Sequence, residues 1–140
     1  MKILAATDGS ERSMKAVLRG LELAEKEGAD VTLIAVAPSL TALLSDVEEL
    51  PGNVQESLDA EAIKAVDKAK ALFDEKGIKV ATMIGRGVTP ANVILETAEN
   101  GKFDLILMGS TGKTGFAKIL IGATATKVVA NAPCSVGIIR

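Results

Sequence analysis

Five short apolar segments recur along the chain, each rich in β-branched and aliphatic residues. Segments of this length, separated by polar and glycine-containing stretches, are typical of β-strands. We therefore predict five strands, over residues 2–7, 31–36, 80–84, 105–108 and 136–139.

The stretches between the predicted strands place apolar residues at helical spacing. Each set of apolar residues falls along one stripe of a helix, which indicates an amphipathic helix packed on a sheet. The first stripe comprises Met14, Val17, Leu18 and Leu21, and the second Ala62, Ala65, Val66, Ala69, Leu72 and Phe73.

Polar residues, glycine and proline mark the helix ends. Ser10 can cap the first helix, and Gly28 follows it where a left-handed residue is favoured. Gly77 closes the second helix in the same way. Thr89 and Pro90 predict the start of a third helix. That helix ends at residues 100–101, and a shorter fourth runs from about 122 to 130 before Pro133.

Strands that alternate with helices predict right-handed βαβ crossovers and a parallel sheet. We expect an α/β fold: a single doubly wound domain over residues 1–140, with a five-stranded parallel sheet in the order 3-2-1-4-5 and about four helices. Residues 37–53 contain two prolines and an acidic run. We interpret them as a long, partly helical connection and not as a domain boundary.

Composition agrees with a covered parallel sheet. The 140 residues include three Phe, no Tyr and no Trp, so the core must be built from Ile, Leu, Val and Ala. Such a core suits parallel strands with helices on both faces. A chain of this length can bury a sizeable core without disulfides.

Charge and the scarcest residue types exclude several functions. A net charge of −2 without a basic tail argues against nucleic acid and membrane surfaces as partners. The absence of His excludes catalytic triads that use it and removes the commonest metal ligand. Cys134 has no partner for an internal disulfide. With no signal-peptide pattern or apolar span, we expect a cytoplasmic location.

A ligand site is predicted at one position of this sheet. In the order 3-2-1-4-5, a crevice opens between the carboxyl ends of the first and fourth strands. Residues 7–10 and 108–115 follow these ends. The second segment suits a phosphate because its glycines expose backbone N–H groups, its Ser and Thr add hydroxyls, and a helix N-terminus follows. The alternative is a loop whose glycines only supply positive φ.

Three similar motifs do not match. A Walker A loop needs glycine where Leu107 stands. A flavodoxin-type loop follows the first strand, and this chain has no Trp or Tyr to stack on flavin. A receiver-type phospho-acceptor domain needs an acidic residue at the end of the third strand, where Gly85 lies.

The whole chain, from residues 6–10 to residues 132–136, resembles the universal stress protein family. The ATP-binding branch of that family has a glycine, two residues, a glycine, nine residues, a glycine and then Ser or Thr. Gly109, Gly112 and Gly122 keep this spacing, but Ala123 replaces the final hydroxyl residue.

The resemblance implies roles for particular residues. Asp8 and Thr7 would lie against the nucleoside, Val36 would offer backbone contacts to adenine, and Met108 with Gly109 would line the base and ribose. Asp8 has an equal alternative as an Asx turn or helix cap. The predicted nucleotide-binding residues are Thr7, Asp8, Val36, Met108, Gly109, Thr111, Gly112, Gly122, Ala123 and Thr124.

The loss of a hydroxyl at position 123 predicts weaker ATP binding, or a preference for a nucleotide with fewer phosphates. One hydrogen bond to a charged group contributes about 1.5 to 3 kcal/mol. Thr124 lies about 100° round the helix and is no automatic substitute, whereas Thr111 or Thr114 offers another path to a phosphate. We interpret Arg86 as a solvated loop residue, although it is also a candidate anion ligand, and Cys134 as a small core residue.

Two functions remain open. The first is an adenine-nucleotide-binding regulatory protein of the stress response that takes ATP, ADP or AMP, with Mg²⁺ able to accompany ATP through Asp8 and phosphate oxygens. It has no catalytic residue and is at most a slow ATPase. The second is a dimeric protein-interaction module that binds no nucleotide. The last strand ends at a sheet edge, where pairing with its copy would give a homodimer, as the resemblance also implies.

Overall fold

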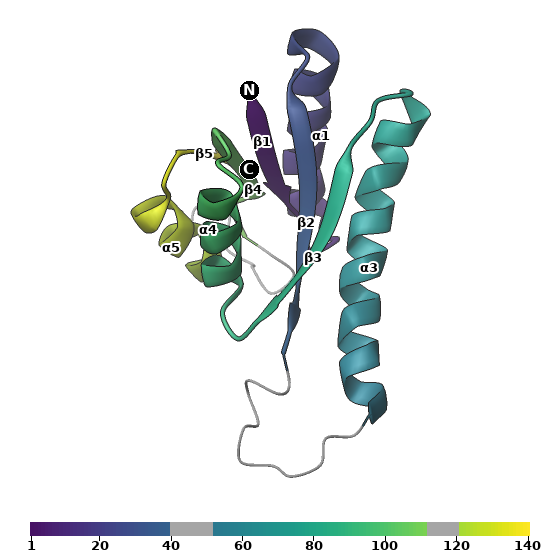
Figure 1. Cartoon of the computed structure of the whole chain (residues 1–140), viewed down its shortest axis with the longest axis vertical. Helices are drawn as coiled ribbons and strands as arrows, with labels where there is room; N and C mark the ends of the chain where they lie inside the picture. The colour runs from purple at the N-terminus through teal and green to yellow at the C-terminus, as the bar shows by residue number, and fades with distance from the viewer. Residues whose placement is uncertain (40–51, 112–120) are drawn as a thin grey trace.

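The computed structural model describes residues 1–39, 52–111 and 121–140 (Figure 1). Within these residues, five parallel strands form one sheet in the order β3-β2-β1-β4-β5. The predicted α/β fold and strand order are confirmed. The strands are β1 Lys2–Ala6, β2 Asp30–Pro38, β3 Ala81–Gly87, β4 Leu105–Gly109 and β5 Ser135–Ile139.

Four helices connect the strands in the described residues: α1 Glu11–Glu27, α3 Gly52–Glu75, α4 Pro90–Asn100 and α5 Ala123–Asn131. The predicted ends of the first two are confirmed. The Ser10 side chain accepts a hydrogen bond from the Ser13 backbone N–H, and Gly28 is left-handed with φ 70°. Gly77, just after α3, is left-handed too, with φ 68°. None of the described helices is long and apolar enough to cross a membrane.

Some boundaries differ from the sequence-based prediction. The strands β2 and β3 continue farther, because Pro38 still pairs with Gly87. Helix α3 begins at Gly52, well before its first predicted apolar residue. The predicted connection over residues 37–53 is therefore strand at one end and helix at the other, and its residues 40–51 lie outside the described chain.

Both ends of α4 also differ in detail from the sequence-based prediction. Thr89 precedes the helix and Pro90 opens it, but the Thr89 side chain makes no capping bond. Gly101 is right-handed with φ −85°, and the left-handed residue is Lys102 with φ 53°. A Cβ at position 101 would come within 2.4 Å of the Phe103 ring. Glycine is thus needed here for space and not for its conformation.

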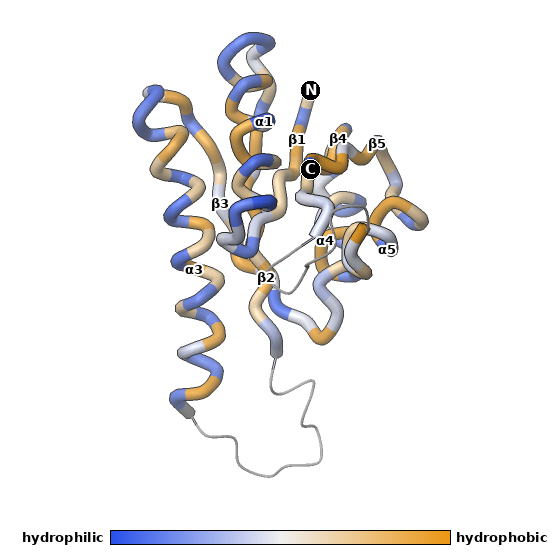
Figure 2. The backbone as a smooth tube through the Cα atoms, turned by 180° about the vertical axis from the view of Figure 1, so that it is seen from behind, coloured by the Kyte–Doolittle hydropathy of each residue, from blue (hydrophilic) through white to orange (hydrophobic). Residues whose placement is uncertain are grey.

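The sheet is covered on both faces, as a doubly wound fold requires. Alternate residues of β1 point to opposite sides: Ile3 and Ala5 pack toward α1 and α3, whereas Leu4 and Ala6 pack toward α4 and α5. Figure 1 shows these two helix pairs on opposite sides of the strands. Along α3, apolar and polar turns alternate in Figure 2, in keeping with one buried and one exposed face.

Candidate functional site

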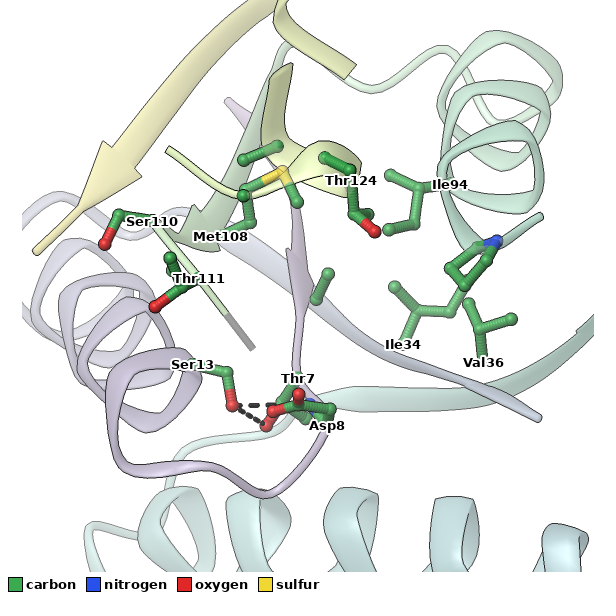
Figure 3. A pocket seen from close by; sticks show the side chains of 16 residues that line it. Thr7, Asp8, Ser13, Ile34, Val36, Ile94, Met108, Ser110, Thr111 and Thr124 are labelled. Carbon is green, nitrogen blue, oxygen red and sulfur yellow. Dashed lines mark hydrogen bonds between the residues drawn. The ribbon is translucent and has the colours of Figure 1, made fainter. Parts of the chain in front are cut away.

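A cavity of about 400 Å³ opens at the carboxyl ends of β1 and β4, where the strand order predicts a crevice. This volume lies in the range of small-molecule sites. The wall combines residues from β1, β2 and β4 with the N-terminal turns of α4 and α5 (Figure 3). Its lining residues are Ala6, Thr7, Asp8, Ser13, Ile34, Val36, Pro90, Ile94, Met108, Gly109, Ser110, Thr111, Gly122, Ala123, Thr124 and Ala125.

The turn after β1 is held by its own side chains. The Thr7 hydroxyl lies 2.8 Å from the Ser13 hydroxyl and accepts a bond of 3.1 Å from the Gly9 N–H. Asp8 Oδ1 accepts a bond of 2.9 Å from the Ser10 N–H, which makes an Asx turn. Asp8 also lines the cavity. The turn-forming role of Asp8 is therefore confirmed, and the same turn fixes its carboxyl group at the cavity wall.

The exit from β4 passes very close to the first turn of α1. A Cβ at Gly109 would lie 2.9 Å from the Arg12 carbonyl carbon and 3.0 Å from the Ser13 nitrogen. Only glycine lets these two backbones approach so closely. The next two residues, Ser110 and Thr111, are buried although polar, with 2% and 7% of their surfaces exposed.

Helix α5 begins at the opposite wall. The Gly122 N–H donates a bond of 2.7 Å to the Ser110 carbonyl oxygen, which ties the start of α5 to the end of β4. Gly122 is the N-cap residue and makes no side-chain cap. Together with Ala123 and Thr124 it lines the cavity. The positive end of a helix dipole thus lies at the wall, where an anion is stabilised.

The remaining wall is apolar. Ile34 and Val36 point from β2 toward the cavity, and Ile94 faces them from α4 (Figure 3). Met108 from β4 is 6% exposed and continues this surface. The cavity therefore has one apolar side, which suits a flat organic ring, and one side of backbone N–H groups and hydroxyls, which suits an anion.

The structure brings the predicted site residues to one place. Nine of the ten line this cavity: Thr7, Asp8, Val36, Met108, Gly109, Thr111, Gly122, Ala123 and Thr124. Gly112 lies outside the described residues, as does Thr114.

Sequence reasoning missed several lining residues. Pro90 and Ile94 of α4, Ile34 of β2 and Ser13 of α1 all contribute to the wall. In the sequence, Pro90 indicates only the start of a helix. Ile94 and Ile34 are apolar residues of a kind also found throughout the core. The available signal was positional, because Pro90 opens the helix that follows β3 at the same edge of the sheet.

Two residues outside the cavity are now placed. Arg86 belongs to β3, so its interpretation as a loop residue is wrong; its guanidinium pairs with Asp59 of α3 at 3.1 and 2.8 Å. Cys134 is partly buried against the α4 and α5 side of the core, as predicted. Burial, and secondarily the charge of Asp104, raises the pKa of the Cys134 thiol.

Among the described residues, no group of three or more Cys, Asp and Glu could hold a metal ion.

The model of the universal stress protein family matches residues 1–140. The chain belongs to that family. A universal stress protein of Methanocaldococcus jannaschii is 38% identical over 144 residues, which cover 99% of this chain and 81% of the relative. The solved universal stress protein UspA of Lactobacillus plantarum is 28% identical with a TM-score of 0.82, covering 100% of this chain and 97% of its own.

Solved universal stress proteins of the same fold include nucleotide complexes. That of Archaeoglobus fulgidus contains dAMP; it is 22% identical with a TM-score of 0.73, over 100% of this chain and 98% of its own. A protein of Arabidopsis thaliana has AMP bound, at 18% identity, a TM-score of 0.71 and coverage of 99% and 90%. Another universal stress protein is in complex with cAMP, at 20% identity, a TM-score of 0.75 and coverage of 100% and 97%.

Proposed function

We propose that this universal stress protein binds an adenine nucleotide, ATP, ADP or AMP, in the cavity between β1 and β4. It acts as a regulatory protein of the stress response in the cytoplasm. The observation that carries the proposal is the division of one cavity into an apolar side and a donor-rich side. A nucleotide has the same two ends, and relatives of this fold hold AMP, cAMP or dAMP.

The apolar side suits the base. Ile34 and Val36 from the sheet and Ile94 from the facing helix border a space where a purine ring would lose contact with water. We assign to Val36 backbone contacts with adenine, and to Met108 and Gly109 the base and ribose side. Asp8, fixed by its turn, would lie against the nucleoside.

The donor-rich side suits the phosphates. The N-terminus of α5 at Gly122 supplies partial positive charge. We also assign contacts with the phosphates to Gly112, Thr111 and Thr124. Ala123 is also in this wall and has no hydroxyl to donate. We therefore infer modest ATP affinity, or better binding of a nucleotide with fewer phosphates, and not an absence of binding.

The bound nucleotide is a signal and not a substrate to be consumed rapidly. Mg²⁺ fits as a companion of ATP, held by phosphate oxygens and the Asp8 carboxyl group, which lines the cavity. The described part of the wall offers no His, Lys, Cys or Glu in the position of a base or nucleophile. We infer that hydrolysis is slow at most.

Calorimetric titration tests this function. Protein stripped of co-purified nucleotide is titrated with ATP, ADP, AMP and adenosine, with and without Mg²⁺. Binding of at least one adenine nucleotide, blocked by Ile94→Glu in the base wall, supports the proposal. The matched control is Ile63→Glu, at an exposed apolar position of α3 away from the cavity. No heat from any nucleotide at millimolar concentration would overturn it.

A second candidate function is a dimeric protein-interaction module. The observation that favours it is β5, which ends the sheet order: among the described strands it pairs with β4 alone, and its other side is open. Such an edge readily pairs with another strand. We propose that two copies pair through β5; the homodimer is compatible with nucleotide binding, and it would be the main function if the cavity binds none.

A further inference from the structure

Arg12 differs from Arg19 and Arg86 in what its guanidinium group binds. Arg19 pairs with Glu22 at 3.0 Å and Arg86 with Asp59 at 2.8 Å. No carboxylate in the described residues pairs with Arg12. Its Nη1 atom donates a bond of 2.6 Å to the Thr111 hydroxyl instead. A positive charge is thus directed at a residue that lines the cavity.

This bond determines what the Thr111 hydroxyl can do. A guanidinium group has only donors, so the Thr111 oxygen must be the acceptor. The hydroxyl hydrogen stays available for a further acceptor. Thr111 is 93% buried and lies in the cavity wall, where a molecule bound in the cavity can supply an acceptor for that hydrogen.

Thr111 also lies beside the start of α5. A Cβ at Gly122 would be 3.5 Å from the Thr111 Cα and 3.7 Å from its Cγ2. The Gly122 N–H bonds to Ser110, the preceding residue. Thr111 is therefore close to the helix N-terminus at which Ala123 lacks a hydroxyl, with its Cγ2 methyl toward Gly122 and its hydroxyl on Arg12.

We propose that Arg12 is a positioning residue for Thr111, and that the pair supplies the phosphates of a bound nucleotide with the hydroxyl donor and positive charge that Ala123 cannot provide. This inference rests on the proposed nucleotide-binding function. It identifies the chemical class at that wall as a phosphate with at least one negative charge. An uncharged nucleoside gains nothing from the pair.

The rigid approach of the two backbones explains how Arg12 can hold this position. Gly109 packs directly against the Arg12 carbonyl group, so the first turn of α1 and the exit of β4 are in direct contact. The Arg12 side chain needs to cross only from one to the other. A single bond therefore sets the direction of the Thr111 hydroxyl before a ligand arrives, which lowers the entropy lost on binding.

The test measures dissociation constants for ATP, AMP and adenosine by calorimetry. The variants are Arg12→Gln, Thr111→Val, the double variant and Thr111→Ser. Arg19→Gln is the matched control, because it also removes one positive charge from α1. Arg12→Gln and Thr111→Val should each weaken ATP binding on the order of ten- to a hundredfold and leave adenosine binding unchanged. The double variant should be little weaker than either single one, and Thr111→Ser should retain affinity.

Each other result has a defined meaning. Equal weakening of ATP and adenosine, or the same loss from Arg19→Gln, would overturn the positioning role. Unchanged ATP affinity in Arg12→Gln would overturn it while the proposed function stands. If the unaltered protein binds no nucleotide, the proposed function fails and this inference with it. Melting temperatures are measured in parallel, and Arg12→Met, which keeps the aliphatic stem without the charge or the donors, replaces Arg12→Gln if that variant does not fold.

Discussion

Gly109 shows how one residue can join two elements. Its missing side chain lets β4 end against the backbone of α1, and the atoms that a Cβ would meet there cannot rotate away. Gly109→Ala should therefore lower the free energy of unfolding by about 1 to 3 kcal/mol.

Gly20→Ala is the matched control, because a Cβ at that helical position would make ordinary contacts of 3.6 Å or more. It should be neutral or stabilise the protein by up to about 1 kcal/mol, since alanine favours helix. Urea unfolding measures both variants. An equal effect of the two substitutions would contradict the close approach at Gly109.

Ala123 predicts a gain of function by substitution. Ala123→Ser restores a hydroxyl at the first turn of α5, where it should bond a phosphate and tighten ATP binding by roughly ten- to a hundredfold. Ala130→Ser, on an exposed part of the same helix, is the control for a general effect of serine. Titration of both variants with ATP provides the comparison. An unchanged constant in Ala123→Ser would argue that no phosphate lies at this position.

The sequence predicted the polar part of the site better than the apolar part. Gly109 and Gly122 keep the spacing of a family motif, and Asp8 follows a strand at the predicted crevice, so they could be identified without coordinates. Ile94 and Pro90 have no such distinction: an isoleucine on a helix stripe is normally a core residue. Only the packing of α4 against β2 places Ile94 at a cavity.

At the scale of elements, an ion pair links β3 to α3. Arg86 donates two bonds to Asp59, and Gln55 donates a third, so the pKa of Asp59 lies below its ordinary value. A lowered pKa in the folded state stabilises the protein above about pH 4, the ordinary value for Asp. The stabilisation is lost as the pH falls through the folded-state value.

Urea unfolding of the unaltered protein, Asp59→Asn and Arg86→Gln tests this link. At pH 7 both variants should be slightly less stable than the unaltered protein, because an exposed pair contributes little. At pH 3 the difference should shrink for both. A difference that stays the same at both pH values would exclude the ion pair as its cause.

Element boundaries were less predictable than element types. The strands β2 and β3 are both longer than their apolar runs, because Ala37 and Pro38 of β2 pair with Arg86 and Gly87 of β3. The sequence of either segment alone does not contain this pairing. Helix α3 similarly begins at Gly52. Its first turns carry Val54, which is exposed, and Leu58, which is partly buried, so the helix continues past its fully buried face, which begins at Ala62.

At the scale of the whole molecule, the strand order followed from alternation of strands and helices together with right-handed crossovers. The order in turn placed the crevice between β1 and β4, which is where the cavity lies. No comparable rule predicts from the sequence how two copies of the chain associate. It depends on how two free edges match, and one chain's sequence specifies only that the β5 edge is apolar.

The proposed homodimer can be tested at that edge. Ile139 directs its carbonyl to Ser110 of the neighbouring segment, so the adjacent Ile138 N–H points to the open side. Ile138→Pro removes this donor without removing a bond to β4, as edge strands tolerate. Sedimentation should show a dimer for the unaltered protein and a folded monomer for the variant, with a melting temperature lowered by the lost packing of the Ile138 side chain on the core. A variant that stays dimeric would place the interface elsewhere.

Nucleotide binding in the cavity is the central claim, and amide NMR of the isotope-labelled, nucleotide-free protein during ATP titration tests it most directly. The absence of Trp and Tyr makes intrinsic fluorescence a poor alternative. We predict saturable shifts of the amide signals of Thr7, Gly109, Thr111 and Gly122. These residues line the cavity from the end of β1, the end of β4 and the start of α5. Signals that stay fixed at millimolar ATP, or shifts confined to residues away from these four, would contradict the claim.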